Sequence, residues 1–78
     1  MGVIEIFGAH GRDEIFAAKE RSEIVCFGTT DGGTFEAKIT AITHMPGRIG
    51  NVGIRAKNGE KEYQGWYNYN THRGVLAP

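Results

Sequence analysis

The sequence predicts a mainly β domain in which one N-terminal helix precedes five antiparallel strands that bend strongly into a small barrel. The clearest evidence is the Asp-Gly-Gly turn at residues 31–33, which supplies the positive φ angles of a tight turn. From Phe35 to Ala41 apolar and polar residues then alternate strictly, as in a strand with one buried face. Similar stretches follow with short connections, and only one segment has helical spacing. This combination is typical of an SH3-like barrel.

The chain of 78 residues is expected to form one domain, residues 1–78, with a small core. Residues 1–11 contain a β-prone run, Val3 to Phe7, which is either an extra edge strand or an arm that packs onto a neighbouring molecule. Residues 12–21 predict the helix, because acidic residues come first and basic residues last, as the helix dipole favours. The barrel is expected to occupy residues 24–77.

Glycine, proline and asparagine mark the connections between the expected strands. The five strands are expected at residues 24–28, 34–42, 51–57, 60–69 and 75–77. The connection over residues 43–50 contains one proline and two glycines, so we expect an irregular loop with Arg48 at its tip.

Residue patterns of catalytic and metal sites are missing from the sequence. Cys26 is the only cysteine, so no disulfide can form within the chain, and its neighbours Val25 and Phe27 predict a buried, unreactive thiol. The three histidines lack the spacing of a zinc site, and no Gly-Lys-Ser/Thr follows the glycines as in a phosphate loop. We therefore expect no metal, no cofactor and no enzymatic activity.

The formal net charge is +0, but the charges are unevenly distributed. Residues 1–36 hold three basic and seven acidic residues, whereas residues 37–78 hold six basic and two acidic residues. Either the second half presents a basic face to a nucleic acid, or the charges cancel across the folded surface. No apolar run has the length of a membrane span and no leader pattern is present, so we expect a cytoplasmic protein that does not contact membranes.

The stretch from Asp31 to Ile42 resembles the first motif of the Sm/LSm family, which comprises small ring-forming RNA-binding proteins. After the Asp-Gly turn, the aromatic, small and aliphatic positions of that motif are matched by Phe35, Ala37, Ile39, Ala41 and Ile42. The second motif of the family centres on Arg-Gly before the last strand, as in Arg73-Gly74. The resemblance covers residues 12–76. The chain departs from the family at Thr43, where Asp is usual, and in a lengthened loop before Asn51.

The resemblance implies a homo-oligomeric ring that binds single-stranded RNA without catalysis. The residues then expected to bind RNA are His44, Arg48, Asn51, Arg73 and Gly74. The residues expected at the interface between copies are Trp66, Tyr67, Tyr69, Val75 and Leu76. An open five-stranded barrel has two unpaired strand edges, and pairing them between copies would close a ring.

Other interpretations of these residues stay open at this point. Asn51 can satisfy the preceding turn, Arg73 can pair with a carboxylate, and the aromatic run at residues 66–69 can fill a core instead of stacking on bases. The alternative function is an SH3-like protein-interaction module, such as a phage-type adaptor or inhibitor, that does not bind RNA.

Overall fold

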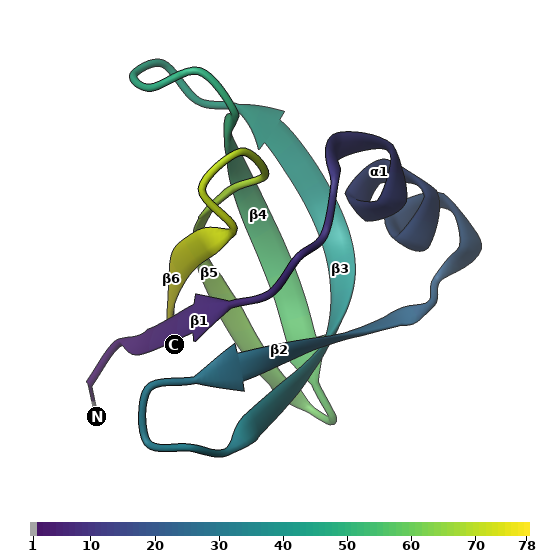
Figure 1. The fold of residues 1–78 in the computed structure, drawn as a ribbon. Helices are drawn as coiled ribbons and strands as arrows, with labels where there is room; N and C mark the ends of the chain where they lie inside the picture. The colour runs from purple at the N-terminus through teal and green to yellow at the C-terminus, as the bar shows by residue number, and fades with distance from the viewer. Residues whose placement is uncertain (1) are drawn as a thin grey trace.

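Six strands form the barrel, one more than the sequence predicts (Figure 1). The computed structural model describes residues 2–78. Its elements are β1 (Ile4–Phe7), α1 (Arg12–Arg21), β2 (Ile24–Thr29), β3 (Thr34–His44), β4 (Asn51–Asn58), β5 (Lys61–Asn68) and β6 (Arg73–Ala77). Each strand pairs antiparallel with the next, and β6 pairs with β1, so the sheet closes on itself. The expectation of a five-stranded barrel is therefore corrected to a closed barrel of six strands.

The additional strand is β1, which closes the gap between β2 and β6. It pairs with β6 over four residues, from Ile4 opposite Leu76 to Phe7 opposite Arg73. Its pairing with β2 is shorter and includes Phe7 opposite Gly28. In this chain β1 is thus neither an edge strand nor an arm on a neighbour. The strand edges of β2 and β6, which were expected to pair with a second copy, instead pair with β1 of the same molecule.

Strand β3 follows the alternation that the sequence predicts. The side chains of Phe35, Ala37 and Ile39 are buried, whereas Glu36, Lys38 and Thr40 are exposed. The pairing with β4 shifts register between Ile39 and Ala41, which is the mark of a β-bulge. Because the bulge reorients the strand, the last third of β3 loses the strict alternation.

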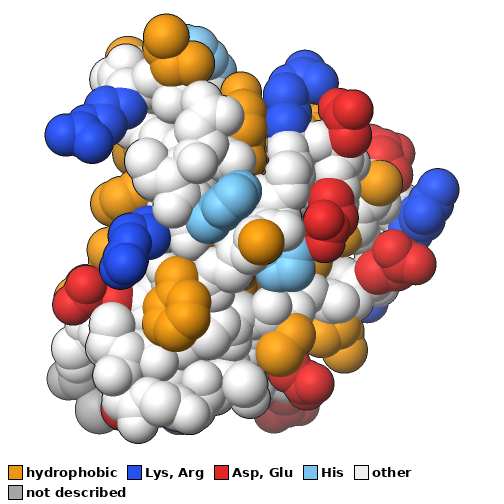
Figure 2. Space-filling view, in the orientation of Figure 1, with side chains coloured by type: hydrophobic (Ala, Val, Ile, Leu, Met, Phe, Trp, Pro, Cys, Tyr) orange, Lys and Arg blue, Asp and Glu red, His pale blue; other side chains and the backbone are white. Residues whose placement is uncertain are grey.

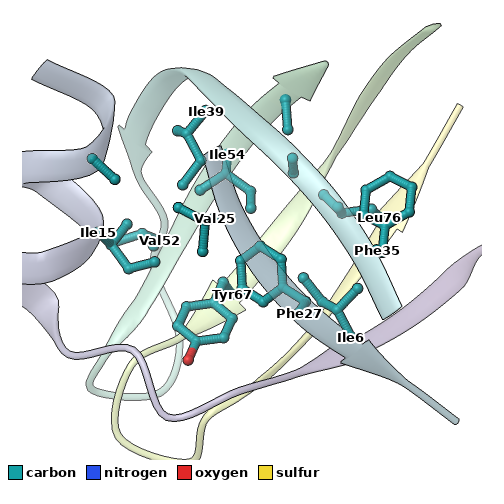
Figure 3. Packing of buried hydrophobic residues seen from close by; sticks show 13 residues of the cluster. Ile6, Ile15, Val25, Phe27, Phe35, Ile39, Val52, Ile54, Tyr67 and Leu76 are labelled. Atoms are coloured by element: carbon teal, nitrogen blue, oxygen red, sulfur yellow. The ribbon is translucent and has the colours of Figure 1, made fainter. Parts of the chain in front are cut away.

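The barrel interior is filled by side chains from every strand and from the helix (Figure 3). The buried apolar residues are Ile6, Ile15, Ala18, Val25, Phe27, Phe35, Ala37, Ile39, Val52, Ile54, Ala56, Tyr67 and Leu76. The helix contributes Ile15 and Ala18, which lie on one side of α1 and pack against the barrel, where α1 contacts β2 and β3. The helix spans the range that the sequence predicts, and it ends at Ser22 in the left-handed conformation.

The prediction of a buried thiol at Cys26 is wrong, since this side chain is exposed. Val25 and Phe27 take the inward positions of β2, so the residue between them faces outward, opposite Glu36 on β3. The continuous apolar run at residues 24–27 concealed this alternation. Ile24 is also exposed, at 65% of its surface.

Within residues 2–78, no helix is long and apolar enough to span a membrane.

Candidate nucleic-acid interface

A cleft of about 530 Å³ lies between α1 and the loop that joins β3 to β4. Its lining residues are Arg12, Phe16, Ile42, Thr43, His44, Met45, Pro46, Gly47, Arg48, Ile49, Gly50, Asn51, Val52 and Tyr69. The walls therefore combine two arginines and one histidine with two aromatic rings, and no lining residue is acidic. Figure 2 shows basic, histidine and hydrophobic side chains over the β3–β4 loop at the top, while most acidic side chains in this view gather near α1.

The α1 wall of the cleft is built from a stacked pair of side chains. The guanidinium carbon of Arg12 lies 5.0 Å from the centre of the Phe16 ring, which is the geometry of a cation–π contact. Arg12 Nη1 also lies 3.2 Å from the Asp13 carboxylate. The opposite wall carries Ile49, whose side chain is 87% exposed at the tip of the loop. Flat and apolar surfaces thus face each other across the cleft.

A buried asparagine at the end of β5 holds the floor of the cleft in place. Asn68 is 2% exposed, and its Nδ2 donates to Asn51 Oδ1 at 2.7 Å and to the Ile49 carbonyl at 3.2 Å. Its Oδ1 accepts from the backbone N–H groups of Asn70 and Thr71 at 2.8 and 2.9 Å. One side chain therefore joins the β3–β4 loop to the β5–β6 turn. The sequence analysis missed this residue, although asparagine is favoured in turns because its side chain can hydrogen-bond the backbone two residues further on.

Three of the residues predicted to bind RNA lie together in the cleft: His44, Arg48 and Asn51. Asn51 is half-buried, and its Oδ1 accepts a hydrogen bond from Asn68 at the end of β5, not from the turn that precedes Asn51. Its Nδ2 takes part in no hydrogen bond within residues 2–78 and is not fully buried, so it is available to a ligand.

The other two predicted residues lie outside the cleft lining. Arg73 is exposed at the start of β6, and both Arg73 and Asn51 are register partners of Asn68. Two strand spacings separate them, which is about 10 Å. Gly74 is buried, and a Cβ added to it would lie 2.3 Å from the Trp66 carbonyl oxygen. Its lack of a side chain allows β6 to approach β5, so Gly74 has a packing role.

The residues predicted for an interface between copies fall into separate environments. Tyr67 and Leu76 are 0% exposed in the barrel core, so their side chains cannot contact a second copy. Tyr69 is half-buried and lines the cleft. Trp66 and Val75 are half-buried and directly opposite each other on β5 and β6. These last two share the outer face of the sheet.

A second polar cluster fixes the start of α1 and therefore the α1 wall of the cleft. His10 Nδ1 lies 2.6 Å from Glu14 Oε2, and His10 Nε2 lies 2.9 Å from the Cys26 carbonyl oxygen. The hydrogen bond from His10 lowers the pKa of Glu14 below its ordinary value. The Tyr67 hydroxyl donates to the Gly8 carbonyl and accepts from the His10 N–H at 3.3 Å, and burial raises the pKa of Tyr67. Sequence reasoning found none of these contacts, and those of His10 with Cys26 and of Tyr67 with Gly8 and His10 join residues far apart in the chain.

Within residues 2–78, no three His, Cys, Asp or Glu side chains are grouped in a way that suits a metal ion.

No protein-family model, curated protein or solved structure matches this chain.

Proposed function

We propose that this protein binds single-stranded RNA, without catalysis, in the cleft between α1 and the β3–β4 loop. The observation that carries the proposal is the lining of the cleft, where two arginines, a histidine and two aromatic rings meet without an acidic residue. Proteins bind unpaired RNA by stacking its bases on aromatic or guanidinium planes and by surrounding its phosphates with cations. The cleft offers both kinds of contact in one place.

The two walls provide complementary parts of such a site. Phe16, with Arg12 stacked on its ring, offers a flat surface to a base, and Tyr69 lines the same cleft. On the loop side, Arg48 supplies positive charge and His44 a ring N–H donor for phosphate oxygens. The free Asn51 amide adds a donor for the edge of a base.

The Asn68 network supports binding by holding the loop before a ligand arrives. The Ile49 carbonyl accepts from both Asn68 and Asn70, and the Gly50 carbonyl accepts from the Tyr69 N–H at 3.0 Å. A loop fixed in this way loses little conformational entropy when RNA binds.

The Sm-like ring stays a prediction, but its physical basis has changed. The barrel is closed by β1, so a ring would have to form through outer faces such as the one with Trp66 and Val75, and not by pairing free strand edges. Light scattering at micromolar concentration measures this directly. A ring predicts several times the mass of one chain, and a monomer contradicts it while leaving the cleft available.

The apolar part of the cleft supports the second candidate, a protein-interaction module. Ile49 is 87% exposed, and Phe16 is 38% exposed on the facing wall. An apolar peptide segment would cover both side chains. Binding of a protein partner without any affinity for RNA would favour this candidate.

The proposed function is tested by fluorescence anisotropy with labelled single-stranded RNA. Phe16→Ala should weaken binding by about 5- to 150-fold, the equivalent of about 1–3 kcal/mol for one stacked base. Arg48→Ala should also weaken binding and reduce the salt slope by about 0.7, the contribution of one phosphate contact.

The control for these variants is Lys61→Ala, which removes an exposed charge at the start of β5, outside the cleft. Arg73→Ala, measured in the same assay, tests whether Arg73 binds RNA as the resemblance implies. If wild-type protein does not bind RNA even at low salt, or if Phe16→Ala and Arg48→Ala bind like the control, the proposed function is wrong. Matched DNA oligonucleotides show whether the cleft requires the 2′-hydroxyl.

A further inference from the structure

Two lysines lie directly opposite each other on the outer face of the sheet. Lys38 on β3 and Lys57 on β4 are register partners, and both are exposed. Like charges at directly opposed positions destabilise a sheet. Arg55 lies two residues from Lys57 on the same face of β4 and is also exposed.

None of these three side chains forms an ion pair within residues 2–78. Glu62 is the register partner of Lys57 on β5, but no carboxylate oxygen lies within 4.0 Å of the lysine. No ion pair within residues 2–78 offsets the repulsion between the two lysines. A polyanion would relieve it.

The three basic side chains lie along β3 and β4 beyond the cleft. Arg55 borders a shallow depression with Thr43 and Met45, and these two residues also line the cleft. Lys38 and Lys57 border the next depression along the strands. From Asn51 to Lys57, β4 extends about 20 Å, at about 3.4 Å per residue.

The first turn of α1, at the opposite exit of the cleft, is acidic. Asp13 and Glu14 stand in the first turn of the helix, and Arg12 is already paired with Asp13. A negatively charged strand that leaves the cleft on this side meets carboxylates. On the β3–β4 side it first meets Arg55 and then the two lysines, where Glu62 lies opposite Lys57 on β5 and Glu36 borders the same depression as the lysines.

We infer that an RNA strand bound in the cleft continues along the outer face of β3 and β4, where Arg55, Lys57 and Lys38 contact its phosphates. The inference rests on the proposed function, because the cleft sets where the strand starts. It adds a binding surface that uses phosphates alone. Such contacts raise affinity without selecting a base sequence.

The test compares short and long RNA with a variant of the outer face. The variant is Lys38→Gln/Arg55→Gln/Lys57→Gln, and the RNAs are about 4 and about 16 nucleotides long, the range of site sizes of small β-barrel domains. For the wild type, the long RNA should bind more tightly than the short one. The variant should lose this gain, keep the affinity for short RNA, and show a salt slope for long RNA that is lower by about 2, for three phosphate contacts.

The control is Lys19→Gln/Arg21→Gln, which removes two positive charges from the last turn of α1, outside both depressions. If this control loses as much affinity for long RNA as the outer-face variant, bulk charge explains the effect and the inference is overturned. If the outer-face variant keeps the gain, the inference is also overturned, although the cleft still binds. If short RNA produces no NMR shifts of cleft amides in the wild type, the proposed function itself fails. The substituted side chains are exposed, so circular dichroism should show an unchanged fold.

Discussion

The Asn68 side-chain amide donates a hydrogen bond to Asn51 Oδ1 over 2.7 Å, and this contact joins the end of β5 to the start of β4 at the floor of the cleft. The same Asn68 also holds the Ile49 carbonyl and two N–H groups of the following turn. All four bonds are made by a side chain that is 2% exposed. Buried polar groups that are fully hydrogen-bonded rigidify a structure, and the loss of one partner leaves the others unsatisfied.

The first prediction concerns this asparagine. Asn68→Ala should lower the free energy of unfolding by at least about 1–3 kcal/mol, because it leaves buried donors and acceptors without partners. Asn68→Asp keeps the acceptor for Asn70 and Thr71 but removes both donated bonds, so it should loosen the β3–β4 loop while the β5–β6 turn stays ordered. Urea unfolding measures the loss of stability in Asn68→Ala. For Asn68→Asp, amide hydrogen exchange should become faster at residues 48–51 and stay unchanged at residues 70–72. Equal exchange in both segments of Asn68→Asp would contradict this division of roles.

A second prediction concerns the hydroxyl of Tyr67. Tyr67→Phe removes the group that contacts Gly8 and His10 and thereby holds the linker between β1 and α1. The free energy of unfolding should fall by about 1–3 kcal/mol, the cost of leaving buried polar groups unpaired. Tyr63→Phe is the matched control, since the Tyr63 ring packs on Phe35 and its hydroxyl forms no hydrogen bond within residues 2–78. Urea unfolding curves of equal midpoint for the two variants would show that the Tyr67 hydroxyl does not stabilise the linker between β1 and α1.

The third prediction is a loss of stability in acid that depends on Glu14. Its pKa is lowered in the folded protein by the hydrogen bond from His10, from an ordinary value of 4.5. A carboxylate with a lowered folded pKa stabilises the fold above its unfolded pKa, and this contribution is lost as the pH falls through the folded value. The melting temperature should therefore decline below about pH 4.5, and less steeply in Glu14→Gln.

Asp31 contributes to the same acid decline, because its pKa is lowered by hydrogen bonds from the Thr29 hydroxyl and the Gly33 N–H. The decline should therefore persist in part in Glu14→Gln. Glu23→Gln, which removes one exposed carboxylate just after α1, is the matched control. Identical melting profiles for Glu14→Gln and the wild type would show that the His10 contact does not stabilise the fold.

Local patterns in the sequence were sufficient to place α1 and to orient most strands. The period of two in β3 and β4 predicts which side chains point inward, because that period follows from strand geometry alone. The order of charges in residues 12–21 places the helix in the same way. His44, Arg48 and Asn51, which the resemblance implies as RNA-binding residues, belong to one connection and its end, and they share one cleft because they are close in the chain.

Closure of the barrel could not be predicted in this way. Whether β1 is an arm, an edge or a closing strand depends on its pairing with β6, about 70 residues away. Cys26 was misassigned because a run of apolar residues has no visible period, and only the packing of Val25 and Phe27 shows which residues point inward.

The sequence by itself determined the mainly β class, the single helix and the inward face of the central strands, since each follows from interactions between residues near one another in the chain. Only the tertiary structure decided that the barrel closes, that Asn68 joins two loops, and that Arg12 and Phe16 face Arg48 across a cleft. These features depend on contacts between distant segments, which form when burial of the common core brings them together.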